Sequence, residues 1–150
     1  MASRSDIAVR EATRADLLAV FRIEKRSFPQ PWPYAAFEQF LGDPGFLVAE
    51  RSETVVGYVI ADVLSDHGTP IGHVKDIAIA PEHRGEGVGS LLLSSALATL
   101  STRGVGWVKL EVRPSNDAAI ALYRQFDFER SHRIPGYYDD GEDAVIMVRG

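Results

Sequence analysis

A glycine-rich segment between a strand-like run and a helix-like run constrains this chain more than any other feature. Residues 73–80 form an apolar run that predicts a strand, and residues 88–104 carry leucines and alanines at helical spacing before a glycine stop. Between them lies the pattern R-x-x-G-x-G, formed by Arg84, Gly87 and Gly89. A strand that leads through glycines into a helix presents free N–H groups at the positive end of the helix dipole. The segment therefore predicts an anion site, most naturally for phosphate.

The spacing of the glycines excludes two common kinds of phosphate-binding motif. The dinucleotide fingerprint G-x-G-x-x-G fails because Ser90 stands in the place of its third glycine. The P-loop fails as well, since no Gly-Lys-Ser/Thr follows. A glycine-rich turn without any ligand remains the alternative for this segment taken alone.

Composition limits the class of protein. With 150 residues, 45% hydrophobic and 25% charged, the chain predicts a single domain over residues 1–150. A net charge of −5 argues against binding to a nucleic-acid backbone, and the lack of cysteine excludes disulfides, zinc–thiolate sites and cysteine nucleophiles. Residues 1–6 are polar and no apolar run approaches membrane-spanning length, so we expect a cytoplasmic protein with no membrane partner.

The remaining periodicity predicts alternating strands and helices. Strands are expected at residues 7–10, 46–50, 55–63, 73–80, 107–112, 128–133 and 143–148. Helices are expected from residue 17 after a capping box at residues 13–16, at 34–41, from residue 88, and at 116–126. Three prolines within residues 27–33 predict a loop. This order predicts an α/β protein whose mixed sheet is covered by helices.

A second informative stretch runs from the strand at residue 107 into the helix that follows. Alternation places Glu111 on the same face as Lys109 and Arg113, where a cross-strand ion pair is the simplest interpretation. Asn116 is placed to cap the next helix, with a ligand contact as the alternative. Tyr123 lies at helical spacing, where a core position and a catalytic one both fit.

Five separated motifs together resemble one superfamily. The run L-E-V-R-x-S-N-x-x-A-I-x-L-Y lies about twenty residues beyond R-x-x-G-x-G, and residues 137–147 read Y-Y-x-x-G-E-D-A-x-x-M. Residues 23–32 and 72–79 are similar to the family's substrate-side loop and central strand. The chain resembles the GNAT acetyltransferases, and more narrowly the N-terminal protein acetyltransferases of the RimI type with their archaeal and eukaryotic relatives. The resemblance implies a GNAT fold with about seven strands and about four helices.

The resemblance also implies a cofactor and a set of site residues. Acetyl-CoA would be the co-substrate, with loop amides on its pyrophosphate, a strand edge along its pantetheine arm and no metal. The implied cofactor-binding residues are Ile77, Ala78, Ile79, Arg84, Gly85, Glu86, Gly87, Val88, Gly89, Ser90, Asn116 and Tyr123. The implied catalytic residues are Glu111 as general base and Tyr123 as general acid, acting directly or through water. The implied substrate-binding residues are Phe28, Pro29, Trp32, Tyr137 and Tyr138.

The implied activity is direct transfer of acetyl from acetyl-CoA to the N-terminal amine of a protein, a ribosomal protein being one candidate. Acetylation of a small amine or a lysine side chain, and a non-catalytic acyl-CoA-binding module, are the alternatives. Two positions depart from the family pattern: Asp127 stands where glycine is usual, which predicts local strain, and Gln30 stands where some relatives carry a glutamate. The preferred first residue of the substrate stays open.

Other chemistry-bearing residues give weaker signals. The four histidines, which lack metal-ligand spacing, are expected in solvent, turn or packing roles; they are His67, His73, His83 and His132. Glu24 is expected to form an ion pair with Arg22, Lys25 or Arg26, with a place in the peptide groove as the alternative. Trp107 is expected to be buried by packing.

Overall fold

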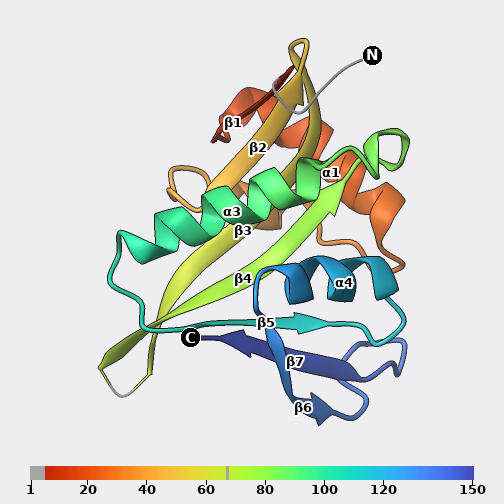
Figure 1. Cartoon of the computed structure of the whole chain (residues 1–150). Helices are drawn as coiled ribbons and strands as arrows, with labels where there is room; N and C mark the ends of the chain where they lie inside the picture. The colour runs from red at the N-terminus through yellow and green to blue at the C-terminus, as the bar shows by residue number, and fades with distance from the viewer. Residues whose placement is uncertain (1–5, 67) are drawn as a thin grey trace.

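A seven-stranded mixed sheet forms the centre of the computed structural model, which describes residues 6–66 and 68–150 (Figure 1). The strand order is β1-β2-β3-β4-β5-β7-β6. The strands are β1 (Ile7–Glu11), β2 (Phe46–Arg51), β3 (Thr54–Asp66), β4 (Thr69–Ile79), β5 (Val108–Val112), β6 (Glu129–Ile134) and β7 (Ala144–Arg149). The α-helices are α1 (Leu17–Ser27), α2 (Tyr34–Glu38), α3 (Val88–Ser101) and α4 (Asp117–Gln125), with 3-10 turns η2 (Arg14–Asp16) and η3 (Pro81–His83).

The predicted order of elements is confirmed, and the boundaries differ by more than one residue in two places. The α2 helix ends at Glu38, three residues early, because the chain turns before the Gly42–Gly45 break. The β3–β4 hairpin is longer than predicted, since its ladder continues to the pair Asp66–Thr69. The added pairs lie outside the apolar runs from which the strands were predicted, because main-chain pairing in a hairpin can continue through polar residues. The predictions on residues 1–5 and His67 fall outside the described residues.

Helices cover both faces of the sheet. The α1 and α2 helices pack on one face around Leu17, Phe37 and Tyr58. The α3 and α4 helices pack on the other face, where Leu92, Leu100 and the β-strand valines form the larger core. Alternation along each strand sends successive side chains to opposite faces, so one sheet serves two cores. None of the helices in these residues is long and apolar enough to cross a membrane.

The sheet opens between β4 and β5. The β4 strand runs antiparallel to β3, but among the described residues it pairs with β5 in parallel over Gly72–Val74 only. The β3–β4 register shifts between Ile60 and Ala61, which marks a bulge at Lys75. Beyond the bulge β4 and β5 diverge (Figure 1). The β5-facing main-chain edge of residues 77–79 is therefore left without a strand partner in the sheet.

Two single-residue expectations have opposite outcomes. Asp127 has a φ of 66°, so it adopts the left-handed conformation that glycine would take most easily. The prediction that Trp107 is buried is wrong, because its side chain is 38% exposed. The β5 strand begins only at Val108, which leaves Trp107 at the end of the sheet.

Candidate active site

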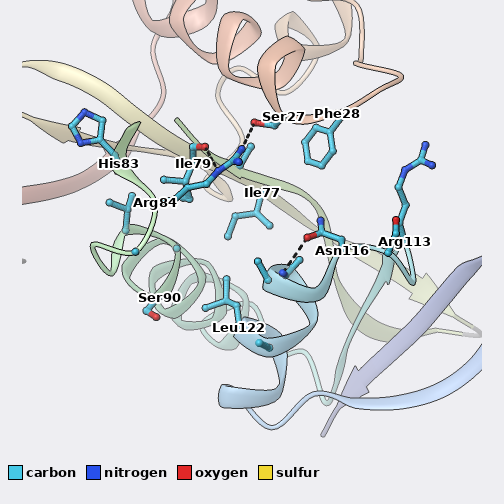
Figure 2. Close-up of a pocket in the computed structure, with 18 of the residues that line it drawn as sticks. Ser27, Phe28, Ile77, Ile79, His83, Arg84, Ser90, Arg113, Asn116 and Leu122 are labelled. Carbon is cyan, nitrogen blue, oxygen red and sulfur yellow. Dashed lines mark hydrogen bonds between the residues drawn. The ribbon is translucent and has the colours of Figure 1, made fainter. Parts of the chain in front are cut away.

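A cavity of about 630 Å³ lies where the sheet opens, between β4, the start of α3, the face of α4 and the loop after α1 (Figure 2). Ten of the predicted cofactor residues line it: Ile77, Ala78, Ile79, Arg84, Gly85, Gly87, Val88, Gly89, Ser90 and Asn116. Phe28 and Pro29, predicted for the substrate, also lie in its wall. Sequence patterns missed Ser27, Leu122 and Gln125, whose positions in the wall depend on helix packing.

Glycine conformation shapes the predicted anion loop. Gly85 and Gly87 have φ values of 79° and 86°, which other residues adopt only with strain. The N–H of Leu91 bonds to the carbonyl of Gly87 at 3.2 Å, so the preceding N–H groups of the first helical turn have no partner within the helix. Those groups at the positive end of the α3 dipole suit a phosphate anion.

Gly89 has a different role from the glycines before it. A Cβ built on Gly89 would lie 3.2 Å from a methyl group of Leu122, so glycine allows α3 and α4 to approach closely. Gly89 and Leu122 both line the large cavity, so the close approach of α3 and α4 shapes its wall.

Arg84 and Glu86 connect the loop to its surroundings. The Arg84 guanidinium donates to the Ile79 carbonyl at 3.2 Å and to the Ser27 hydroxyl at 3.3 Å (Figure 2). Glu86 does not line the cavity; its carboxylate binds Arg51 and lies 3.1 Å from His83 Nδ1. The hydrogen bond with His83 is the main reason that the pKa of Glu86 lies below its usual value. Any contact of Glu86 with a cofactor would therefore involve its main chain.

A smaller cavity of about 170 Å³ adjoins the large one, and the two share Phe28, Ile77, Arg113, Asn116 and Ala119 as lining residues. Glu111 and Tyr123, the predicted base and acid, both lie in its wall. Trp32 and Tyr138, predicted for the substrate, line it as well. Two further carboxyl groups line it: Glu24, for which a place in the peptide groove was the alternative, and Asp76, which no sequence pattern singled out.

Glu111 is paired with a histidine across the short parallel contact. Both carboxylate oxygens of Glu111 lie within hydrogen-bond distance of His73 Nε2, at 2.9 and 3.0 Å. Burial favours the neutral carboxyl, but the bond from His73 and nearby positive charges outweigh it and hold the pKa of Glu111 below its usual value. Glu111 is thus paired across strands, as predicted, and its partner is His73. The sequence had suggested only solvent, turn or packing roles for this histidine.

Tyr123 and Asn116 lie on α4 beside this pair. Tyr123 is 5% exposed, and burial, followed by the charges of Asp76, Tyr138 and Glu111, raises its pKa. Its hydroxyl is therefore protonated at neutral pH. The Asn116 side chain accepts a bond from the Ala119 N–H at 3.2 Å, which confirms the predicted helix cap.

The loop between β6 and β7 covers the entrance from the other side. Tyr137 and Tyr138 meet edge to face at 5.0 Å, and the Arg113 guanidinium lies 4.0 Å from the centre of the Tyr138 ring. Arg113 also pairs with Asp140 and Glu142 at 2.8 and 2.9 Å. Tyr138 lines the smaller cavity and burial raises its pKa to about 12, whereas Tyr137 lines neither cavity and is 48% exposed.

The prediction that Glu24 pairs with Arg22, Lys25 or Arg26 is wrong, and its position in the wall of the smaller cavity agrees with the alternative, a place in the peptide groove. Glu24 is 2% exposed and accepts hydrogen bonds from the Tyr58 hydroxyl and, at 2.9 Å, from the Trp32 N–H. It lies on the buried face of α1, four residues after Val20, and this face packs against the sheet. Arg26, one of the expected partners, pairs with Glu82 instead.

Within residues 6–66 and 68–150, no cluster of three or more histidine, aspartate and glutamate side chains is arranged to hold a metal ion. The chemistry available here is that of a carboxylate, a phenol and main-chain groups next to an anion-binding loop.

Comparison with known proteins agrees with this arrangement. The profile of the Acetyltransferase (GNAT) family matches residues 17–128. The chain is 32% identical to an N-alpha-acetyltransferase of Saccharolobus solfataricus, over 96% of this chain and 93% of that one. It is 34% identical to the [ribosomal protein bS18]-alanine N-acetyltransferase of Escherichia coli K12, over 89% and 90%. The crystal structure of Ard1 from Thermoplasma volcanium, 28% identical, superposes with a TM-score of 0.89 over 96% and 97% of the two chains.

Proposed function

The chain belongs to the GNAT acetyltransferase family and is an acetyl-CoA-dependent protein N-acetyltransferase, and we propose that it acetylates the N-terminal α-amine of a ribosomal protein. The observation that carries the proposal is the pair of adjoining cavities. One has an anion-binding loop and a free strand edge, and the other has Glu111 and Tyr123 beneath two loops. One relative is named an N-alpha-acetyltransferase and another a [ribosomal protein bS18]-alanine N-acetyltransferase, and both names support the same class of acceptor.

The large cavity suits acetyl-CoA in shape and in polar groups. The first turn of α3 offers N–H groups to the pyrophosphate, and residues 77–79 offer main-chain groups to the extended pantetheine arm. Because this strand leads to the wall shared with the smaller cavity, the thioester would lie near Asn116. The acetyl group then faces the acceptor amine.

Glu111 is the proposed general base. An α-amine has a pKa of about 7.7–8.0, so at neutral pH much of it is protonated and cannot attack a thioester. The carboxylate of Glu111, ionised beside His73, takes that proton directly or through a water molecule. The neutral amine attacks the thioester carbonyl carbon, a C–N bond forms and the C–S bond breaks. The nitrogen loses its second proton to solvent as the amide forms, and Glu111 releases its own proton to solvent before the next turnover.

Tyr123 is the proposed general acid. The departing thiolate of CoA needs a proton, and the Tyr123 hydroxyl, which burial keeps protonated, supplies it. The phenolate that remains is reprotonated from solvent before the next turnover. Direct transfer needs no covalent enzyme intermediate, in keeping with a chain that has no cysteine.

The activity test is a panel of acceptors assayed by thiol release from acetyl-CoA. Peptides with free N-termini, including one that begins with alanine, are compared with the same peptides blocked at the N-terminus, with free lysine and with small amines. We expect turnover with the free N-terminal peptides and little with the others. Equal turnover of blocked peptides that contain lysine would instead identify a side-chain acetyltransferase.

A further inference from the structure

Glu24 is a buried carboxylate in the wall of the smaller cavity, and the proposed acid–base chemistry does not use it. It lies on α1, beneath the loop from Phe28 to Trp32 that forms one side of the cavity. A buried carboxylate is costly unless it is hydrogen-bonded. The hydrogen-bond partners of Glu24 therefore indicate its role.

The bonds of Glu24 hold both ends of that loop. Its main-chain carbonyl accepts the N–H of Phe28 at 3.1 Å, and its carboxylate accepts the N–H of Trp32 at 2.9 Å. Prolines at positions 29, 31 and 33 have no N–H, so residues 28–33 contain three N–H groups in all. The bond from Phe28 ends α1 and would form with any residue at position 24, whereas the bond from Trp32 depends on the Glu24 carboxylate.

Two further side chains hold the carboxylate in place. The Tyr58 hydroxyl, on β3, donates to Glu24 and lies 3.0 Å from Asp76 Oδ2. Asp76, on β4, is itself hydrogen-bonded to Glu24. The hydroxyl has one proton, which the Glu24 and Asp76 carboxyl groups share as acceptors, so Tyr58 links the two side chains. Burial and then the neighbouring Glu24 carboxyl group raise the pKa of Asp76 well above its usual value.

The anchored loop contributes residues to both cavities. Phe28 lines both of them, and Trp32 lines the smaller one while its indole packs on Phe37 and Phe40. The loop is thus fixed by aromatic packing on one side and by Glu24 on the other. Movement of the loop would change the shape of the acceptor cavity and leave the anion loop, at the start of α3, where it is.

We propose that Glu24, held by Tyr58 and Asp76, is a positioning residue that fixes the loop of residues 28–33 in the shape that receives the acceptor peptide. The inference rests on the proposed function, since it assigns the loop to the peptide. It predicts an effect on peptide KM that is separate from kcat and from acetyl-CoA binding. A residue with only a structural role would lower stability without this separation.

The first test compares Glu24→Met with Glu24→Gln. Methionine keeps the volume but removes the acceptor for the Trp32 N–H, whereas glutamine keeps an acceptor oxygen. We expect Glu24→Met to raise peptide KM roughly tenfold, the effect of losing one charge-assisted hydrogen bond, with kcat and acetyl-CoA affinity little changed. Glu24→Gln should restore most of the peptide affinity. An unchanged peptide KM in folded Glu24→Met, or an equal loss of acetyl-CoA affinity, would overturn the proposal.

Asp16→Leu is the matched control. Asp16 is another buried carboxylate at an end of α1, and it accepts the N–H of Thr13 at 2.7 Å, but it lies outside both cavities. It should lower the melting temperature and leave peptide KM unchanged. If Glu24→Met does not fold, Tyr58→Phe, which removes only a hydroxyl, takes its place and should also raise peptide KM.

Hydrogen exchange at the Trp32 amide gives a readout that does not need turnover. The bond to Glu24 should protect this amide in the native protein, and Glu24→Met should remove the protection while Asp16→Leu retains it. Equal protection in Glu24→Met and the native chain contradicts the inference even if no peptide is acetylated. Loss of protection in a chain that acetylates no N-terminal peptide would contradict the proposed function and leave the anchoring of the loop supported.

Discussion

Glu111 and Tyr123 carry opposite pKa shifts inside one small cavity. His73 and nearby positive charges lower the pKa of Glu111, and burial raises that of Tyr123. At neutral pH the first is therefore a carboxylate and the second a protonated phenol. These are the forms that a base and an acid need before the reaction starts.

Removing either group should slow the reaction without preventing cofactor binding. General acids and bases contribute about 10²–10⁴-fold each, so Glu111→Gln and Tyr123→Phe should each lower kcat by roughly that factor. Both changes keep the shape of the side chain and remove only its proton chemistry. Steady-state assays with an N-terminal peptide at saturating acetyl-CoA measure the effect, and near-normal kcat in both variants would refute the two assignments.

The pH profile provides the control for these variants. Because the pKa of Glu111 is lowered, this carboxyl group is already fully ionised at pH 6. Its ionisation therefore cannot limit activity at any higher pH. The rise in kcat/KM from pH 6 to pH 8 should follow the amine, whose pKa is about 7.7–8.0. With a peptide whose amine has a lower pKa, this rise should occur at lower pH. In Glu111→Gln the rise should persist, with lower kcat/KM throughout. If the apparent pKa of this rise were the same for every peptide, the rise would report a group of the enzyme and not the amine.

At the scale of elements, one arginine connects β5 to the loop that covers the acceptor cavity. Arg113 stacks on Tyr138 and pairs with Asp140 and Glu142, and Glu142 also accepts the Ser115 N–H at 3.1 Å. The loop is thus fixed against the end of β5. Its sequence could show that Tyr137 and Tyr138 are in a turn-rich segment, but not which of the two faces the cavity.

Arg113→Leu should loosen this loop and weaken peptide binding. We expect peptide KM to rise roughly tenfold, since the change removes charge-assisted bonds and leaves two carboxylates without their partner. Arg133→Leu is the control, because Arg133 pairs with Asp143 at 2.7 Å in the same region and lines neither cavity. The variants are compared by peptide KM at saturating acetyl-CoA. A similar increase in both would assign the effect to general loosening of the loop.

At the scale of the whole molecule, the sheet consists of two parts with a narrow junction. The part from β1 to β4 meets the part from β5 to β7 through the three-residue pairing of Gly72–Val74 with Val108–Leu110. The large cavity lies in the opening beside this junction and is lined from both parts. A ligand that fills it contacts both parts and should stabilise the native state as a unit.

Acetyl-CoA at a hundred times its dissociation constant should stabilise the fold by about 2.7 kcal/mol. For a chain of this size, that corresponds to a rise in melting temperature of about 5–10 °C. Thermal unfolding with and without acetyl-CoA measures it.

Ser90→Glu tests whether the anion loop is responsible for this stabilisation. A carboxylate in the first turn of α3 suits the helix dipole, so the ligand-free fold should keep its stability. It should repel the pyrophosphate and remove most of the shift, whereas Ser90→Gln, of equal size and no charge, should retain more of it. An undiminished shift in Ser90→Glu would place the pyrophosphate elsewhere.

Features that depend on a local pattern could be predicted from the amino-acid sequence alone. Apolar periodicity predicted the order of strands and helices, the glycines between β4 and α3 marked the anion loop, and spacing placed Asn116 as a cap. Alternation in β5 put Glu111 on the polar face. Such features follow from the residue and its near neighbours, so they can be predicted without knowledge of the fold.

Contacts between side chains that are distant in the sequence depend on the fold, and no sequence pattern predicted them. His73 reaches Glu111 because the short β4–β5 pairing sets His73 opposite Lys109, two residues away from Glu111. Glu24 meets Trp32 because α1 turns that face toward the sheet beneath the loop. The bulge in β4 and the divergence of β4 from β5 open the large cavity beside them. Strand register and helix rotation are set by the packing of the whole core, and a short sequence pattern contains no information about them.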